Sequence, residues 1–294
     1  MRRDLKDCII IGGGPAGLTA ALYLARYLRN VTVIDAQEGR GRLIPKTHNL
    51  SPFPQGISGL VLLDRMRSHA ELYGATLETG TVSSVKKHGD GFQITTDRGT
   101  ETARTVIFAC GVFNHRPPLS RADHEQGLAR GLIRYCPVCD AFEVRDKRIA
   151  VLGNDAHGFE EASFIRPYSA SVTLIPPDGS PVVARSGIRV LDAPIKSLAI
   201  SESEAMVTLQ NGTIAHFDTL YVALGTTPQS ALAAQLGVNL SATGHIATDA
   251  RQRTNIEGAY AIGDITDGLD QIAVAMGQGA VAATAVHNDL MSAG

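Results

Sequence analysis

The sequence has few cysteines and no excess of charge of either sign. Only 4 of its 294 residues are Cys, which is too few for the disulfide framework that holds small secreted domains together. The 27 Lys and Arg residues are balanced by 29 Asp and Glu residues, which leaves a formal net charge of −2. Nucleic-acid-binding proteins normally carry a basic excess, so the composition argues against that class.

The sequence also lacks an apolar run long enough for a signal peptide or a membrane span. The uncharged stretch Cys8–Ala25 is interrupted by the turn-forming segment Gly12–Pro15. The apolar part before this interruption, Cys8–Ile11, is shorter than the ~7–15 apolar residues of a signal peptide and the ~20 of a transmembrane helix. We therefore expect a soluble, cytoplasmic protein with no membrane association.

Glycine, in contrast, is abundant. The chain contains 30 Gly residues, more than the usual ~7%. Apolar residues make up 44% of the chain and charged residues 19%, which is typical of a globular protein. A chain of this length is expected to form about two domains.

Two copies of one nucleotide-binding unit are predicted from the order of the elements. In the first copy a strand, a glycine turn, two helices around a second strand, a hairpin and a buried strand follow one another: Asp7–Ile11, Pro15–Arg29, Val31–Asp35, Gly59–Tyr73, Val82–Lys86 with Phe92–Thr96, and Thr105–Cys110. The second copy repeats this order more briefly: Arg148–Leu152, Glu160–Ser169, Ser171–Ile175, Met206–Gln210 with Thr213–Phe217, and Thr219–Leu224. Helical and alternating apolar spacing identify the elements, and the repetition identifies an internal repeat. In the second helix of the first copy the spacing places the following residues on one face: Leu60, Leu63, Met66, Ala70 and Tyr73.

The C-terminal tail is predicted to complete the first copy. It contains one strand, Ala259–Ile262, and a helix of small residues, Ile272–Leu290, and it is too short for an independent domain. The predicted fold class is α/β, with two Rossmann-like three-layer ββα dinucleotide-binding domains, the second inserted in the first. We place the first domain at residues 1–117 and 245–294 and the second at 118–244, with crossing points at Pro117-Pro118 and Thr243-Gly244.

A dinucleotide fingerprint opens the first copy. Gly12, Gly14 and Gly17 follow a strand and begin a helix. In such a motif the first glycine makes the tight turn, the second admits the pyrophosphate and the third lets the helix pack on the strand. Asp35 ends the next strand, where an acid binds a ribose hydroxyl. The alternative is a glycine turn without a ligand.

Cys136 and Cys139 form a Cys-x-x-Cys pair between the two copies. Thiols at this spacing can close a short disulfide on one helical turn, and their low thiolate pKa favours exchange. Zinc binding is one alternative, although a tetrahedral site needs about four ligands and the other two cysteines, Cys8 and Cys110, lie in predicted core strands. Inert buried cysteines are another.

Asp140 directly follows the cysteine pair. A carboxyl group at this position can take or give the proton of a thiol. It also fits the first turn of a helix, where the helix dipole favours an acid. One residue can serve both purposes.

These motifs together resemble the low-molecular-weight thioredoxin reductases over essentially the whole chain. The resemblance rests on the fingerprint at Gly12–Gly17 and on three further segments: Phe53–Gly59, Cys136–Asp140 and Gly258–Asp264. It implies an enzyme, a flavin disulfide oxidoreductase that forms a homodimer. It also implies that Cys139 faces a flavin and that Cys136 exchanges with the substrate.

The same resemblance implies that the first site holds FAD. Asp264 is then expected at the ribityl or pyrophosphate part of the cofactor, and Asn49 near the flavin ring. The family usually has Arg before Gln271, where this chain has Asp270. The full set of expected cofactor-binding residues is Gly12, Gly14, Pro15, Ala16, Gly17, Asp35, Ala36, Asn49, Val82, Cys110, Gly111, Gly263, Asp264, Gln271, Ile272 and Ala273.

The second fingerprint departs from the reductases, in which this copy binds NADPH. Its middle glycine is replaced by Asp155 in the segment Gly153–Gly158, and the added charge would repel a phosphate. The His-Arg-Arg stretch that grips the 2′-phosphate in the reductases is also missing, and residues 167–184 contain no Lys or Arg. The alternative is a variant site whose arginines come from elsewhere, such as Arg166, Arg185 or Arg189. His157 would line the altered pocket.

The sequence thus predicts an FAD-dependent thiol–disulfide oxidoreductase that works without NADPH, as in the pyridine-nucleotide-independent branch of the resembled family. Electrons pass between FAD and the Cys136–Cys139 pair and then to or from a thioredoxin-like protein or a small dithiol. The candidate electron donors or acceptors are ferredoxin, a second flavin in the altered site, and oxygen. An ordinary NADPH-dependent thioredoxin reductase and a non-catalytic flavin-binding redox sensor are the alternatives. No metal and no nucleic acid are expected.

Overall fold

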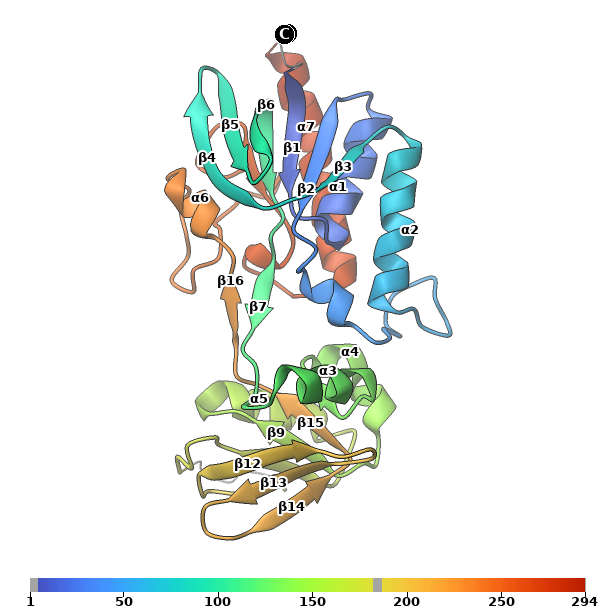
Figure 1. The fold of residues 1–294 in the computed structure, drawn as a ribbon, viewed down its shortest axis with the longest axis vertical. Coiled ribbons are helices and arrows are strands. Elements are labelled where there is room, and N and C mark those ends of the chain that lie inside the picture. The colour runs from blue at the N-terminus through green and yellow to red at the C-terminus, as the bar shows by residue number, and fades with distance from the viewer. Residues whose placement is uncertain (1–4, 182–186, 294) are drawn as a thin grey trace. The chain divides into compact units, whose positions relative to one another are not determined.

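The computed structural model describes residues 5–181 and 187–293 and divides into two compact units. Unit 1 comprises Met1–Ile44, Ile57–Phe113 and Thr227–Gly294. Unit 2 comprises Pro45–Gly56 and Asn114–Thr226. The predicted class is confirmed, because both units contain a Rossmann-like parallel sheet and the second is inserted in the first (Figure 1).

The sheet of unit 1 is built around β1, whose last four residues, Cys8–Ile11, are apolar and buried. Parallel strands follow the order β3-β2-β1-β6, and β17 also pairs with β6. The antiparallel hairpin of β4 and β5 joins the first half of β6. The bounds are β1 Lys6–Ile11, β2 Val31–Asp35, β3 Thr76–Thr79, β4 Val82–His88, β5 Gly91–Thr96, β6 Gly99–Phe108 and β17 Ala259–Ala261.

Three helices of unit 1 lie side by side: α1 (Pro15–Arg26), α2 (Gly59–Leu72) and α7 (Ile272–Ser292) (Figure 1). Small residues allow α7 to approach α1 closely, since a Cβ added at Gly279 would lie 2.5 Å from the carbonyl oxygen of Ala16. The short elements η1 (Arg40–Leu43), η3 (Gly263–Ile265) and α6 (Ala231–Gln235) complete the unit.

The predicted apolar face of α2 is wrong at its two ends. Leu60 is 53% exposed and Tyr73 is 43% exposed, whereas Leu62 and Leu63 are buried. With about 3.6 residues per turn, Leu60 points away from the side on which Leu62 lies. The buried stripe therefore runs through Leu62, Leu63 and Ala70.

Unit 2 repeats the strand–turn–helix–strand order. Its parallel sheet has the order β11-β10-β9-β15-β8. A separate antiparallel sheet is formed by β12, β13 and β14, which come between β11 and β15 in the sequence. The strands are β8 Ile133–Arg134, β9 Ile149–Leu152, β10 Val172–Ile175, β11 Arg189–Val190, β12 Ile195–Ile200, β13 Ala205–Leu209, β14 Ile214–Phe217 and β15 Thr219–Val222. The helices are α3 Arg121–Ala129, α4 Pro137–Asp140, η2 Ala141–Val144 and α5 Asp155–Ile165. Helix α5 starts and ends earlier than the predicted Glu160–Ser169, because it begins directly after the glycine turn.

The two connections between the units pair with one another as short strands, β7 (Val112–Asn114) and β16 (Thr226–Pro228). The chain returns to unit 1 at Thr227, upstream of Thr243-Gly244. The apolar side chains of Ala233 and Val238 pack in the core that includes β4 and β5. Among the described residues, no helix is both long enough and apolar enough to cross a bilayer.

Candidate functional site

The β1–α1 turn of unit 1 has the backbone of a dinucleotide cradle. Gly12 has φ +112°, and a Cβ there would lie 2.3 Å from the carbonyl oxygen of Ala109. A Cβ at Gly17 would lie 2.0 Å from the carbonyl oxygen of Gly12. A Cβ at Gly14 would meet no atom of the described chain within 4 Å. Gly12 and Gly17 therefore serve the fold, whereas Gly14 leaves open space in front of the helix.

The start of α1 is ready to receive an anion. Gly14 is its N-cap, no side chain of the described residues caps it, and its first turn contains no acid. The first N–H groups of a helix have no partner within the helix, and together with the helix dipole they form an anion site. The turn thus fits the pyrophosphate of a dinucleotide.

Asp35 lies where the ribose acid was predicted, against the glycine turn. A Cβ added at Gly13 would lie 2.6 Å from its carboxyl group. The carboxylate accepts a hydrogen bond from the backbone N–H of Gln37 at 3.1 Å and is paired with Arg67 at 3.3 Å. The Asp35 carboxylate is therefore held beside the glycine turn by one contact to each of its oxygens.

The other predicted cofactor residues of unit 1 lie mostly at the carboxyl ends of its parallel strands. Gly12 lies against Ala109, which directly follows β6. A Cβ at Gly263 would lie 3.0 Å from the Cβ of Ala16. Val82 differs, because it is buried in the core at the start of β4. The remaining residues lie after β2, after β6, in η3 and at the start of α7: Ala36, Cys110, Gly111, Asp264, Gln271, Ile272 and Ala273.

Arg40 is a residue of this site that the sequence analysis missed. Its Nη2 lies 2.8 Å from the carboxylate of Asp264 and 2.9 Å from that of Asp270. Burial and the nearby charge of Asp264 raise the pKa of Asp270, and Arg40 opposes this. Arg40 of η1 is thus the cation that neighbours Asp270 in this chain.

Asn49 belongs to unit 2 together with the rest of Pro45–Gly56. Its Nδ2 donates to the carbonyl oxygen of Val138 at 3.4 Å. Val138 lies between the two cysteines of the pair. The residue predicted to lie near a flavin ring therefore contacts the backbone of the redox motif.

Cys136 and Cys139 form a disulfide with an S–S distance of 2.07 Å. The motif folds as the short helix α4, with Pro137 at its first position and Cys136 as its N-cap. The Cys136 sulfur accepts a hydrogen bond from the backbone N–H of Cys139 at 3.2 Å. Residues 5–181 and 187–293 contain no group of three or more His, Cys, Asp or Glu arranged to hold a metal ion.

Asp140 is the last residue of α4 and is held from two sides. Its Oδ2 accepts from Nη1 of Arg134 at 2.5 Å and its Oδ1 accepts from the hydroxyl of Tyr221 at 2.7 Å. Burial raises the pKa of Asp140, while Arg134 and Tyr221 lower it. Neither partner was singled out from the sequence, because neither lies in a motif.

The other two cysteines, Cys8 and Cys110, have thiols that stay protonated and unreactive at neutral pH. Cys8 lies inside β1 and Cys110 follows β6, where its sulfur donates to the carbonyl oxygen of Ile11 at 3.5 Å. Burial raises the pKa of both thiols to about 12. The thiolate is the reactive form of cysteine, so both act as packing residues at neutral pH.

The second fingerprint keeps the glycines that the fold needs. A Cβ at Gly153 would lie 2.8 Å from the carbonyl oxygen of Ala223, and a Cβ at Gly158 would lie 2.7 Å from the carbonyl carbon of Gly153. These contacts are the counterparts of those at Gly12 and Gly17. The position equivalent to Gly14 is Asp155, whose side chain lies outside the described residues.

The two described arginines that were considered for a 2′-phosphate, Arg166 and Arg189, do not lie together at the end of β10. Arg166 donates to the carbonyl oxygens of Ser169 and Gly187, and Ser169 precedes β10, at the opposite end from Ile175. Arg189 lies in β11, paired in register with Thr173. Arg185 lies outside the described residues.

The altered site instead presents an acid. Glu161 in α5 has its Oε1 at 3.4 Å from Nε2 of His157. Its Oε2 and the Oδ1 of Asn154 are buried and have no hydrogen-bond partner among the described atoms. Burial raises the pKa of Glu161 to about 7.

Comparisons with known proteins agree with this geometry. The model of the pyridine nucleotide-disulphide oxidoreductase family matches residues 6–279. The chain is 32% identical over 284 residues to the thioredoxin reductase of Streptomyces clavuligerus, covering 90% of this chain and 87% of that one. It is 32% identical over 299 residues to the bifunctional thioredoxin reductase/thioredoxin of Mycobacterium leprae (strain TN), covering 95% of this chain and 64% of that one. The crystal structure of thioredoxin reductase from Streptococcus pyogenes MGAS5005 superposes with a TM-score of 0.89 at 28% identity and covers 98% of this chain and 99% of that one. The chain therefore belongs to the pyridine nucleotide-disulphide oxidoreductase family and is a thioredoxin reductase-like flavin disulfide oxidoreductase.

Proposed function

We propose that the protein is an FAD-dependent thiol–disulfide oxidoreductase that passes electrons between FAD and the Cys136–Cys139 pair without using NADPH. The observation that carries the proposal is the closed Cys136–Cys139 disulfide, followed directly in the sequence by the half-buried carboxyl group of Asp140. Cys-x-x-Cys thiols in a polarising environment exchange readily with other thiols and disulfides. The pair is then the centre through which a partner is oxidised or reduced.

The β1–α1 cradle of unit 1 supports FAD as the cofactor. The open space at Gly14 and the uncapped start of α1 suit the pyrophosphate, and Asp35 suits a ribose hydroxyl. Arg40, held between Asp264 and Asp270, supplies positive charge at the same end of the sheet. FAD bound there would supply a second two-electron carrier, in addition to the Cys136–Cys139 pair. We extend the proposal to the full predicted set of cofactor residues.

The altered fingerprint of unit 2 supports independence from NADPH. Asp155 replaces the glycine against which a pyrophosphate would lie, and Glu160 and Glu161 add two further acids to the same helix. Recognition of a 2′-phosphate depends on Arg or Lys, and Arg166 is bound to backbone carbonyls elsewhere. Ferredoxin, oxygen, and a second flavin in this altered site are the proposed electron donors or acceptors.

The proposed partner is a thioredoxin-like protein or a small dithiol. The Mycobacterium leprae relative is named a bifunctional thioredoxin reductase/thioredoxin, which links the two activities in one chain. Asn49 contacts Val138 between the two cysteines, so a partner that reacts with the pair must approach beside this loop. Small dithiols meet the least steric hindrance there.

Anaerobic mixing of the flavin-loaded protein with NADPH, NADH or dithiothreitol tests the proposal. We expect dithiothreitol to bleach the flavin absorbance through the cysteine pair and both nucleotides to leave it unchanged. A Cys139→Ser variant should lose the response to dithiothreitol, while a Cys8→Ser variant, altered at a buried thiol, should keep it. Rapid stoichiometric bleaching by NADPH would instead establish the ordinary NADPH-dependent reductase. Bound flavin without any thiol-dependent reaction would establish the redox sensor.

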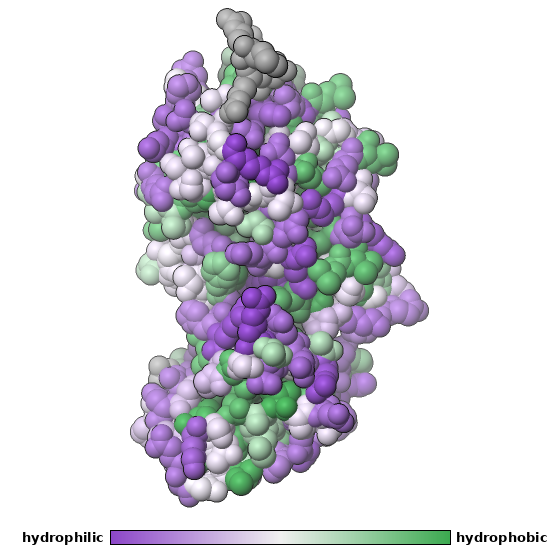
Figure 2. All heavy atoms as spheres, viewed as in Figure 1, coloured by the Kyte–Doolittle hydropathy of each residue, from purple (hydrophilic) through white to green (hydrophobic). Residues whose placement is uncertain are grey.

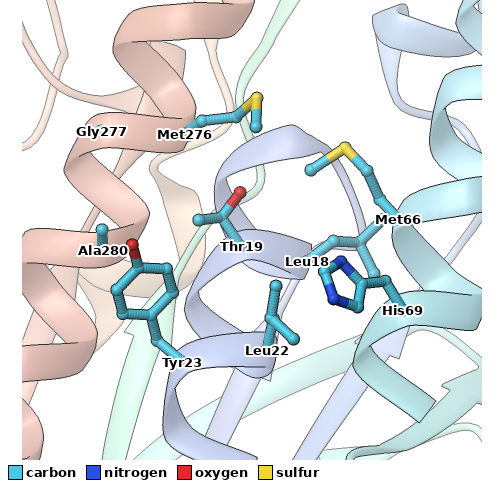
Figure 3. Close-up of a pocket in the computed structure, with 9 residues that line it drawn as sticks. All are labelled: Leu18, Thr19, Leu22, Tyr23, Met66, His69, Met276, Gly277 and Ala280. Atoms are coloured by element: carbon cyan, nitrogen blue, oxygen red, sulfur yellow. The ribbon is translucent and has the colours of Figure 1, made fainter. Parts of the chain in front are cut away.

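We also propose that two copies pair through the exposed side of α1, α2 and α7. A cavity of about 390 Å³ lies between these helices and no Asp, Glu, Lys or Arg lines it (Figure 3). In the close-up Met276 comes from α7 and Met66 from α2, with α1 and its Thr19 between these helices, and Tyr23 lies next to Ala280. Figure 2 shows hydrophobic atoms on the side of unit 1 where α2 lies. A two-fold interface buries the same apolar patch of both copies, which suits this face.

A further inference from the structure

Two strands of unit 2 present a pair of side chains to Asp140. Arg134 ends β8 and Tyr221 lies in β15, and the two residues are directly paired in the parallel register of these strands. Register partners on neighbouring strands point to the same face of a sheet. The Arg134 guanidinium and the Tyr221 hydroxyl therefore meet the carboxylate together, one on each oxygen.

All three side chains are held with little freedom to move. Tyr221 is fully buried, and the side chains of Arg134 and Asp140 are 19% and 23% exposed. Gly131 makes room for the guanidinium, since a Cβ there would lie 2.9 Å from Nη2 of Arg134. Side chains fixed by packing on regular elements hold a reactive group more precisely than loops do.

The surroundings of Asp140 shift the pKa of its carboxyl group in opposite directions. Burial raises its pKa, as does Glu143 of η2, whereas the charge of Arg134 and the two hydrogen bonds lower it. Helix α5 also packs against α4, but its His157 and Glu161 are paired with each other. The Arg134–Tyr221 pair is therefore the contribution that favours an ionised carboxylate against burial.

We propose that Arg134 and Tyr221 are positioning residues that keep the Asp140 carboxylate ionised, so that it accepts a thiol proton when the adjacent disulfide oxidises a dithiol. The inference rests on the proposed thiol–disulfide function. A carboxylate that already accepts one hydrogen bond on each oxygen is aligned before the reaction, and a remaining lone pair on either oxygen can accept the proton.

The step balances as follows for a small dithiol. One dithiol sulfur bonds to a cysteine sulfur, the Cys136–Cys139 bond breaks and the other cysteine sulfur departs as a thiolate. The second dithiol sulfur then attacks the first one, the bond of the mixed disulfide breaks, and the cysteine held in the mixed disulfide is released. The dithiol loses two electrons and two protons: both electrons go to the cysteine pair, one proton goes to a cysteine sulfur and the other to Asp140.

The test follows the protonation of Asp140 in the oxidised, flavin-loaded protein. Its carboxyl infrared band is identified by subtraction of an Asp140→Asn spectrum and titrated in wild type, Tyr221→Phe, Arg134→Met and Arg134→Lys. We expect the midpoint to rise by about one pH unit or more in Tyr221→Phe, to rise at least as far in Arg134→Met, and to return toward wild type in Arg134→Lys. Tyr135→Phe is the matched control, because its hydroxyl bonds to His124 and not to Asp140.

A second readout ties the titration to the reaction. The acidic limb of the pH profile for reduction of the pair by dithiothreitol should move to higher pH together with the Asp140 midpoint. Unchanged midpoints in Tyr221→Phe and Arg134→Met would overturn the inference, as would shifted midpoints with an unshifted reaction profile. A wild-type disulfide that dithiothreitol does not reduce at any pH would overturn the proposed function, while shifted midpoints would still support the positioning role.

Discussion

Glu161 is a buried acid whose ionisation should weaken the folded protein. Its side chain is 17% exposed, one carboxylate oxygen has no partner among the described atoms, and burial raises its pKa from 4.5 to about 7. A group that titrates at higher pH in the folded state stabilises that state below its unfolded pKa, and this contribution is lost as pH rises through the folded pKa. Stability should therefore fall between about pH 4.5 and about pH 7 because of Glu161.

The magnitude follows from the same two values. At 1.36 kcal/mol for each pKa unit, the rise from 4.5 to about 7 corresponds to about 3 kcal/mol. A Glu161→Gln variant keeps the size of the side chain but does not ionise. We expect it to match wild type near pH 4.5 and to be about 3 kcal/mol more stable above pH 7.

Urea unfolding followed by circular dichroism at a series of pH values measures this difference. Glu160→Gln is the matched control, since Glu160 is the exposed neighbour of Glu161 on the same helix. The control should follow wild type across the series. A Glu161→Gln variant whose advantage does not grow with pH, or a control that gains equally, would refute the burial argument.

Three further predictions come from unit 1 and from the thiols. Gly17→Ala should lose both FAD and thermal stability because of its 2.0 Å approach to Gly12, whereas Gly14→Ala should keep its stability and lose FAD, as measured by flavin content and melting temperature. The native protein, once reduced, should take up two equivalents of iodoacetamide per chain at about pH 8, because burial raises the pKa values of Cys8 and Cys110 to about 12. Mass spectrometry counts the labels, and four labels per chain would contradict the assignment. Met66→Lys should shift the protein from dimer to monomer in light scattering, whereas Lys87→Met, distant on β4, should not.

The sequence predicted the parts of the site that are contiguous in the chain. The glycine fingerprint and the cysteine pair each depend on a few residues at fixed spacing, and the structure gives both the local geometry that this spacing predicts. Arg40, Arg134 and Tyr221 could not be found in this way. Each reaches its partner through strand pairing or through a loop that returns from elsewhere, and a single charged or aromatic residue leaves no pattern in the sequence.

The ends of elements were predicted less well for a related reason. The true start of α5 depends on the glycine turn before it, whereas apolar spacing marks only the part that packs. Residues 227–244 contain the short helix α6, and its burial against β4 is set by tertiary contacts rather than by a strong local pattern. The apolar face of α2 was misplaced because the exposed Leu60 and Tyr73 have the same helical spacing as the buried Leu63 and Ala70.

The two fingerprints separate glycines required by the fold from the glycine required by a ligand. Gly12 and Gly17, like Gly153 and Gly158, lie so close to neighbouring backbone that a side chain would displace it. Gly14 has no such neighbour among the described residues, so only a bound phosphate gives a reason to keep it free of a side chain. The second copy retains both fold glycines and has Asp155 at the third position. Unit 2 therefore keeps the sheet that holds Arg134 and Tyr221 against Asp140, and with it the cysteine pair, although the third position of its fingerprint carries a side chain.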